Sequence, residues 1–179
     1  MEFFEAIHAR QSIRKFQDKP VEADTLMKIL EAANRAPSAG NLQAYQIVVV
    51  QEPVVKARLD AASGHQGSLA EAPVVLVFCA HPQESATRYG SRGEDLYCIQ
   101  DATIACAYAQ LAATALGLAS VWIGAVFEPE MVRDALRLGG SQWPIALLPL
   151  GSPAEQPPRK PRRPLQETVR WIASPRQKA

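Results

Sequence analysis

The stretch Val-Val-Leu-Val-Phe-Cys-Ala at residues 74–80 contains only apolar side chains. A strand with one face in water alternates apolar and polar residues, so an unbroken apolar run predicts a strand that is buried on both faces. Such a strand needs a covering layer on either side. The sequence is therefore expected to fold around a central sheet.

Patterns typical of strands and helices alternate on both sides of this run. β-branched and apolar residues predict further strands at residues 45–50, 120–123 and 145–150, and Pro149 suggests a sheet edge or a strand end in the last of them. Apolar residues and helix-start signals predict helices at residues 2–9, 23–35, 53–62, 95–116 and 129–138. This alternation is typical of an α/β or α+β layer fold with one central sheet.

The helix predicted at residues 95–116 carries small apolar residues around most of its circumference, which places it in the centre of the fold. Residues 81–93 are polar and turn-rich, and no regular element is expected there. A last short strand is predicted at residues 168–173, with the sequence TVRWIA.

Length and composition predict one globular domain. Hydrophobic residues make up 47% of the 179 residues and charged residues 21%, which is unlike a disordered chain. The formal net charge of +1 argues against a general attraction to polyanions. We therefore interpret residues 1–179 as a single domain, of which residues 151–179 form an extended C-terminal tail.

The chain shows no signal for a membrane or for export. No segment approaches the run of about 20 apolar residues that a membrane-spanning helix needs. The N-terminus MEFFEAIHAR mixes acidic with apolar residues and has no small-residue cleavage site, unlike a secretory signal. A cytoplasmic protein without a membrane partner is expected.

Cysteines and histidines give no sign of metal or thiol chemistry. Cys79 and Cys106 lie in apolar segments, and with Cys98 they form no C-x-x-C pair, so three reduced, mostly buried thiols are expected. The three histidines are scattered without the spacing of metal ligands. No metal site is predicted.

A basic segment, RQSIRKF, covers residues 10–16. In an extended chain side chains alternate between two faces, so Arg10, Ser12 and Arg14 would share one face while Ile13 points to the core. Two guanidinium groups beside a hydroxyl can bind a phosphate and a polyol chain. Taken alone, the segment also fits a solvated basic turn.

The loop APSAGNLQ, residues 36–43, follows the second predicted helix. Pro37 ends that helix, and Gly40 permits a backbone conformation that other residues rarely adopt. The side-chain amides of Asn41 and Gln43 both donate and accept hydrogen bonds, which suits the pyrimidine edge of a heterocycle. A polar helix-to-strand connection is the alternative interpretation.

A second basic segment, KPRRP, lies at residues 160–164. Its prolines keep the chain extended and reduce the entropy lost on binding a ligand. It fits either a cationic clamp for phosphate or a basic, disordered tail. The standard nucleotide loops, G-x-G-x-x-G after a strand and G-x-x-x-x-G-K-[ST], are absent from the sequence.

Together with QDATIACAYAQLAATALGLASVWIGA (residues 100–125) and LLPLGSPAE (residues 147–155), these three segments make the chain resemble the nitroreductase family over nearly its whole length. The family's opening R-x-S-x-R pattern is matched at Arg10, Ser12 and Arg14. The resemblance implies an α+β, nitroreductase-like fold with a central mixed or antiparallel sheet flanked by helices. It also implies a homodimer with FMN at the interface and a C-terminal extension that embraces the partner subunit.

By similarity, both subunits contribute to the cofactor site. Arg10 and Ser12 would hold the phosphate and ribityl end of FMN, and Arg14 would lie near the pyrimidine edge of its ring. Lys160 and Arg162 would also contact the phosphate, and the backbone of Ile123 and Gly124 would pass beside the flavin. The other subunit would contribute Pro37, Ser38 and Asn41, and Gln43 would also lie near the ring.

The resemblance implies an FMN-dependent oxidoreductase with a ping-pong mechanism. NADH or NADPH would pass a hydride to the flavin and leave, and an electron-poor small molecule such as a nitroaromatic or a quinone would then be reduced in the same place. Arg14 would stabilise the negative charge of the reduced ring. The protein then needs no catalytic acid or base of its own for the hydride step.

Several points stay open at the level of sequence. Residues 63–73 and 81–93 are shorter than in longer family members, so the acceptor and the choice between NADH and NADPH are undetermined. Tyr89 and Tyr97 are candidates for a substrate pocket, although packing is the simpler role. The basic tail contains one aromatic residue, Trp171, which disfavours a nucleic-acid-binding module.

Alternative functions on the same fold are flavin fragmentation, dehalogenation of iodotyrosine, and storage or sensing of FMN. The motifs around the phosphate are common to all of them, so the sequence does not separate these functions from the hydride transfer above.

Overall fold

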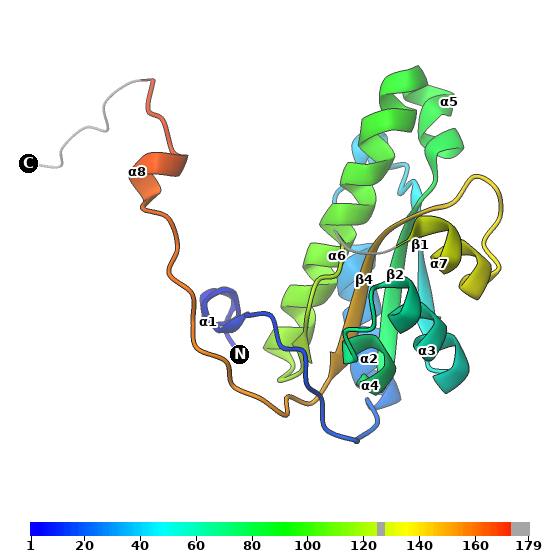
Figure 1. Cartoon of the computed structure of the whole chain (residues 1–179). Coiled ribbons are helices and arrows are strands. Elements are labelled where there is room, and N and C mark those ends of the chain that lie inside the picture. Colours follow the sequence, from blue (N-terminus) through cyan, green and yellow to red (C-terminus); the bar gives the residue numbers. More distant parts are fainter. Residues whose placement is uncertain (125–127, 173–179) are drawn as a thin grey trace, which may run out of the picture.

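The computed structural model describes residues 1–124 and 128–172 (Figure 1). Its sheet has the strand order β1-β2-β4-β3, and all three neighbouring pairs are antiparallel. The strands are β1 (Tyr45–Val50), β2 (Val74–Ala80), β3 (Ala119–Ser120) and β4 (Trp143–Gly151). Helices flank this sheet, so the predicted α+β class with a central sheet is confirmed.

Strand β2, the apolar run that predicts the sheet, lies between β1 and β4, and all seven of its residues are buried. Its alternate side chains enter two separate hydrophobic cores, Val75, Val77 and Cys79 in one and Val74, Leu76 and Phe78 in the other. Burial of each such side chain stabilises the fold by about 1.5–3 kcal/mol. The strand is apolar on both faces because each face meets a layer of helices.

Each face of the sheet has its own set of helices. One core includes residues of α3 (Pro53–Ala62), α4 (Ser68–Glu71) and α7 (Pro129–Leu136). The other includes residues of α2 (Ala23–Asn34) and α6 (Cys98–Ala115). The helices predicted in these regions are confirmed, apart from shifts of a few residues at their ends.

Helix α6 is the long central helix that the small residues predict (Figure 1). It ends in a Schellman motif, because the N–H of Leu118 donates to the Ala113 carbonyl (2.9 Å) and the N–H of Gly117 donates to the Thr114 carbonyl (3.0 Å). Gly117 has φ +81°, which glycine adopts without strain. The chain thereby turns directly into β3.

The polar segment before α6 is helical rather than irregular. Helix α5 (Pro82–Arg92) begins with a proline in its first turn, and a π-helical turn, η2 (Gly93–Tyr97), joins it to α6. Gly90 has φ +57° and bends α5 just before η2. The polar composition reflects the exposed face of α5, which Figure 1 shows beside one end of α6.

Two expectations for the strands of the sheet itself are wrong. Strand β3 covers only Ala119–Ser120, because beyond it Ile123 alone forms a bridge, to Leu147. Pro149 lies inside the central strand β4 rather than at an edge. It is tolerated there because the side of β4 away from β2 is paired only at residues 147, 150 and 151 in the described chain, so the proline falls between paired positions.

Both ends of the chain run outside the sheet and its two layers of helices. Helix α1 (Phe3–Ala9) forms as predicted, and residues 152–164 are free of helix and strand except for a bridge at Pro153. In Figure 1 the tail passes α1 before it reaches α8 (Leu165–Thr168), which projects away from the body.

The strand predicted at residues 168–173 is not formed within the chain. Thr168 closes helix α8, residues 169–172 pair with no described strand, and Ala173 lies outside the described residues. None of the helices in the described chain is both long and apolar enough to cross a membrane.

The three cysteines are buried and free, as predicted. Burial raises the pKa of the Cys79 thiol to about 12 and also raises those of Cys98 and Cys106. We therefore expect no reaction with a thiol reagent at pH 8 in the native state and three labelled cysteines after unfolding in urea. Mass spectrometry after labelling checks this, and rapid native labelling of any of the three would contradict it.

Candidate functional site

Two segments from opposite ends of the chain lie side by side, and we call them the N-terminal arm (residues 10–17) and the C-terminal arm (residues 152–163). Their backbones form an antiparallel bridge between Phe16 and Pro153. Hydrogen bonds of 2.9 Å join the arms at two further places, from the N–H of Gln17 to the Ser152 carbonyl and from the N–H of Ala154 to the Lys15 carbonyl. These backbone contacts join residues 15–17 to residues 152–154, the part of the C-terminal arm that precedes the basic segment at residues 160–164.

Glu155 fixes this contact through its carboxylate. Its Oε1 atom accepts the backbone N–H of Arg14 (2.6 Å) and that of Lys15 (3.2 Å). The carboxylate therefore satisfies the backbone, and the Arg14 guanidinium forms no ion pair within the described chain. Arg14 is exposed and remains available to a ligand.

The N-terminal arm is anchored to the sheet at its inner side. The N–H of Ile13 donates to the Ser120 carbonyl (3.0 Å), and Ser12 forms a parallel bridge with Ser120. The buried Gln110 side chain of α6 donates to the Ser120 hydroxyl at 3.3 Å. Ile13 is buried, as the alternation of the arm predicts, while Arg10 and Ser12 are half-buried.

The C-terminal arm returns toward the start of the N-terminal arm. The Arg159 guanidinium donates to the carbonyl of His8 in α1, which holds the arm beside that helix. Burial, and then repulsion by the Arg162 guanidinium, lower the pKa of Arg10. Arg10 and Arg162 are therefore close enough to repel each other, whereas Lys160 is exposed on the same arm.

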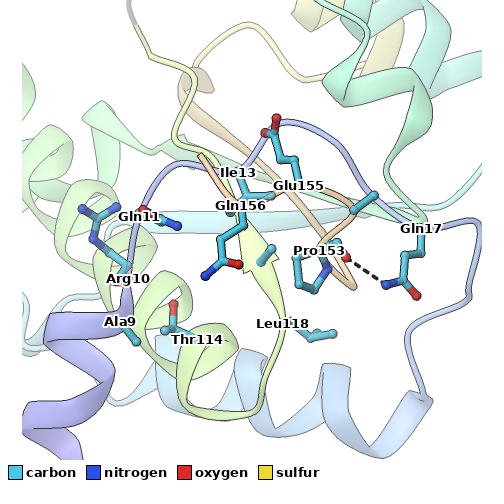
Figure 2. A pocket seen from close by; sticks show the side chains of 12 residues that line it. Ala9, Arg10, Gln11, Ile13, Gln17, Thr114, Leu118, Pro153, Glu155 and Gln156 are labelled. Carbon is cyan, nitrogen blue, oxygen red and sulfur yellow. Dashed lines mark hydrogen bonds between the residues drawn. The ribbon is translucent and has the colours of Figure 1, made fainter. Parts of the chain in front are cut away.

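A cavity of about 600 Å³ lies where the arms meet, and Figure 2 shows the side chains around it. Arg10 and Gln11 lie at one side of it, and Gln17 donates to the Pro153 carbonyl (2.8 Å) at the other. The other lining residues come from α1, the end of α6, the start of β3 and both arms: Ala9, Ile13, Thr114, Leu118, Ala119, Ala154, Glu155 and Gln156. Among its lining residues, Arg10 is the only cationic one and Glu155 the only acidic one.

The second predicted site, the loop 36–43, has an unusual backbone. It contains a short 3₁₀ turn, η1 (Ala39–Asn41), and three left-handed residues, Gly40 (φ +57°), Asn41 (φ +58°) and Gln43 (φ +51°). A left-handed conformation costs a residue with a Cβ atom about 1–2 kcal/mol, and such strain gathers at binding sites. The N–H of Gln43 donates to the Ser38 hydroxyl (3.0 Å), which helps to fix the loop.

Asp101 holds this loop and is a residue that sequence reasoning missed. It lies in the first turn of α6 with 2% of its surface exposed, and its Oδ1 atom accepts the N–H of Ala39 at 2.9 Å. Burial raises the pKa of the carboxyl, while the hydrogen bond from the backbone N–H of Ala39 lowers it in part. Its signal in the sequence is that Asp101 is the only charged residue of α6.

A second cavity, of about 710 Å³, opens at the loop. It is lined by Glu31, Asn34, Arg35, Ala36, Pro37, Asn41 and Gln43. It shares no lining residue with the cavity between the arms. Within one chain, the structure thus groups the basic arms in one place and the predicted loop contacts in another.

The W-I-G-A segment lies next to β4. Ile123 is buried, and its backbone exchanges two hydrogen bonds with Leu147, of 3.0 and 2.9 Å. Gly124 is exposed, and a Cβ atom there would lie 2.7 Å from the indole nitrogen of Trp122, so a larger residue would require the indole to shift. Ala125 lies outside the described residues. Trp122 packs against the core of α2 and α6, as expected for a core residue.

Among residues 1–124 and 128–172, no group of three or more His, Cys, Asp or Glu side chains is placed to hold a metal ion. Each cavity instead offers one guanidinium group and several side-chain amides, with Arg10 at the first cavity and Arg35 at the second. Cationic and amide groups of this kind bind a phosphate and a polar heterocycle.

The chain belongs to the nitroreductase family, whose family model matches residues 7–66 and 56–152. It is similar to an NADH dehydrogenase of Thermus thermophilus, with 36% identity over 90% of this chain and 92% of the relative. It is also similar to an FMN reductase [NAD(P)H] of Bacillus subtilis, with 33% identity over 94% of this chain and 72% of the relative.

Solved structures show the same fold. NfrA2 of B. megaterium superimposes with a TM-score of 0.88, covering 98% of this chain and 76% of that one at 28% identity. The family that the sequence motifs predict is therefore confirmed.

Replacement of Asp101 tests its role at the loop. We expect Asp101→Ala to lower the free energy of unfolding by about 1–3 kcal/mol, because the Ala39 N–H loses its acceptor. Asp101→Asn keeps one acceptor oxygen and should lose less. Urea unfolding followed by circular dichroism measures both, and equal stability of wild type and Asp101→Ala would contradict the role.

The pH dependence of the free energy of unfolding of the same proteins separates the effect of the Asp101 charge from that of its hydrogen bond. A carboxyl whose folded pKa is raised stabilises the fold below its unfolded pKa of about 4, and that contribution is lost as the pH rises through the folded value. As the pH rises from about 4 through the folded pKa of Asp101, the free energy of unfolding of wild type should therefore fall relative to that of Asp101→Asn. A difference between them that stays constant from pH 3 to pH 7 would count against a buried, ionised Asp101.

Proposed function

We propose that the protein is an FMN-dependent oxidoreductase that takes a hydride from NADH or NADPH and passes it to an electron-poor acceptor such as a nitroaromatic or a quinone. The observation that carries this proposal is the pairing of the two arms, which brings Arg10, a lining residue of the arm cavity, within electrostatic range of Arg162. Neither guanidinium forms an ion pair with another described residue. Two like charges held together in this way call for an anion between them.

A phosphate monoester fits this place in charge and geometry. It carries about −1.5 to −2 charges at pH 7 and offers three acceptor oxygens. Arginine binds such oxygens through paired N–H groups. Arg10 and Arg162 would hold the phosphate of FMN together with Lys160, and the hydroxyl of Ser12 lies on the same arm for the ribityl chain.

The names of the relatives support the same chemistry, since they include an NADH dehydrogenase and an FMN reductase. When bound, FMN supplies the two-electron chemistry, a hydride exchange first with NAD(P)H and then with the acceptor. The chain's own groups bind and orient. Ile123 and Gly124 offer backbone beside the ring, and no side chain is required as a catalytic acid or base.

We assign to Arg14 the electrostatic stabilisation of the reduced flavin ring. Its guanidinium is exposed and forms no ion pair in the described chain, while its backbone is fixed by Glu155. A cation at the pyrimidine end of the ring stabilises the negative charge that two-electron reduction leaves there. Asn41 and Gln43, held in left-handed conformations, would present their amides to the same polar edge.

We further propose a homodimer in which Pro37, Ser38 and Asn41 come from the second subunit. This unites the arm cavity of one chain with the loop cavity of the other, which the single chain keeps apart. The N-terminal helix supports such an interface, because Phe3 and Phe4 are 63% and 72% exposed although their spacing predicts a buried stripe. Exposed apolar groups of this size mark contacts between proteins.

The C-terminal tail is assigned to the same interface. Trp171 and Ile172 are 65% and 91% exposed beyond helix α8. A tail that projects from its own domain with large apolar side chains can bury them only against another molecule. We propose that it embraces the partner subunit. A cytoplasmic location is also proposed, since the three cysteines are free thiols.

Substitution of the two arginines tests the phosphate site. Each of Arg10→Gln and Arg162→Gln removes one charge-assisted contact, so each should weaken FMN binding at least about ten-fold. Quenching of FMN fluorescence during titration measures the Kd. Arg58→Gln on α3, an exposed arginine that lines neither cavity, is the control and should match wild type. Equal Kd values for all four proteins would contradict the site.

Rapid mixing tests the reaction itself. The flavin-loaded protein, mixed with NADH or with NADPH without oxygen, should lose the absorbance of oxidised FMN and regain it when a quinone is added. Steady-state rates at several acceptor concentrations should give parallel double-reciprocal lines, as a ping-pong mechanism requires. Bound FMN that stays oxidised with both donors would instead favour storage, sensing or a different flavin chemistry.

Truncation tests the tail. A chain that ends at Pro164 lacks α8 and the exposed apolar side chains beyond it, so its dimer should dissociate at a concentration at least about ten-fold higher than wild type. Sedimentation velocity over a dilution series measures this, and circular dichroism confirms that the domain is folded. Identical sedimentation of truncated and full-length protein would exclude a role of the tail in the dimer.

A further inference from the structure

Four side chains of α5 and η2 form a compact group, which we call the arginine–tyrosine patch: Arg88, Tyr89, Arg92 and Tyr97. The Cζ atoms of Arg88 and Arg92 each lie 5.5 Å from a ring centroid, of Tyr89 and Tyr97 respectively. The two rings pack edge to face with centroids 5.1 Å apart. The cationic groups are therefore held by aromatic contacts, in a region that sequence composition describes only as polar.

Neither guanidinium of the patch has an acidic partner among the described residues. No carboxylate oxygen lies within 4.0 Å of either group, although Glu94 and Asp95 are close in sequence, and Glu84 is beside His81 at 3.6 Å. The Nε–H group of Arg92 donates a hydrogen bond to the Tyr97 hydroxyl (2.9 Å). Most N–H groups of both arginines stay free to donate to a ligand.

The patch lies directly against the loop that holds Asn41 and Gln43. The Arg88 guanidinium donates to the Gly40 carbonyl at 3.3 Å. A Cβ atom at Gly40 would lie 2.5 Å from the Tyr89 hydroxyl and 2.7 Å from the Arg88 guanidinium. A Cβ atom at Gly40 would therefore displace the ends of both side chains, and glycine adopts the φ of +57° there without strain. The patch and the loop are therefore in direct contact at Gly40.

We propose that the arginine–tyrosine patch binds the 2′-phosphate of NADPH and gives the enzyme a preference for NADPH over NADH. This inference rests on the proposed function, in which the nicotinamide occupies the ring site beside the loop 36–43. The adenosine end of the donor must then lie outside that site. NADPH differs from NADH only in a phosphate monoester on the adenosine ribose, which carries about −1.5 to −2 charges.

The patch suits this group in two respects. Two guanidinium groups without acidic partners match a dianion that offers three acceptor oxygens. Their stacking on tyrosine rings fixes them before the ligand arrives, which reduces the entropy lost on binding. NADH and NADPH share the diphosphate that joins their two halves. A comparison of the two donors therefore separates the effect of the 2′-phosphate from that of the diphosphate.

Donor kinetics provide the first test. The measured quantity is the ratio of kcat/KM for NADPH to kcat/KM for NADH. This ratio should fall about ten-fold or more in Arg92→Gln and in the double variant Arg88→Gln/Arg92→Gln. Arg92→Gln leaves the hydrogen bond from Arg88 to Gly40 intact. Arg58→Gln should keep the wild-type ratio. An equal loss with both donors, or an unchanged ratio, would overturn the proposal.

Equilibrium binding provides a second test that does not depend on turnover. The probes are adenosine 2′,5′-bisphosphate and 5′-AMP, measured by calorimetry on the FMN-loaded protein. Wild type should bind the bisphosphate at least about ten-fold more tightly than 5′-AMP, and the double variant should lose that difference. Equal affinity of wild type for both probes would overturn the patch assignment, whereas failure of the proposed function would appear as an absence of FMN uptake or reduction by either donor.

Discussion

The proposed site depends on the backbone pairing of the two arms, which places Arg10 at the arm cavity and within electrostatic range of Arg162. Two guanidinium groups do not stay together unless the backbone holds them there, and here the pKa of Arg10 is lowered by burial and by its neighbour. The paired arms and the carboxylate of Glu155 supply the restraint. Arg10 and Arg162 form no ion pair within the described residues, and we propose that a bound anion neutralises them.

The rest of the fold supports this arrangement and a second one. Strand β2, buried on both faces, fixes the two layers, and α6 connects both sites. At one end of α6, Asp101 holds the loop with its strained Asn41 and Gln43. Near the other end, Gln110 supports Ser120 and through it the N-terminal arm. A single helix therefore positions two half-sites, which a dimer would combine into one.

The sequence predicts those features whose cause is local or whose motif is specific. The run at residues 74–80 predicts the central strand, and alternation predicts the buried Ile13. It fails where neighbours decide: Pro149 is tolerated inside β4 only because one side of that strand is incompletely paired. Helix α5 is missed because its residues are mostly polar, and Asp101 because only packing reveals which backbone groups its carboxylate receives.

The most direct measurement compares FMN with riboflavin, which has the same ring and ribityl chain but lacks the phosphate. If the arms bind a phosphate monoester through two charge-assisted contacts, the wild-type protein should bind FMN roughly 100-fold more tightly than riboflavin at low salt. Equal affinity for the two flavins would show that the arms do not hold a phosphate and would contradict the account of the site.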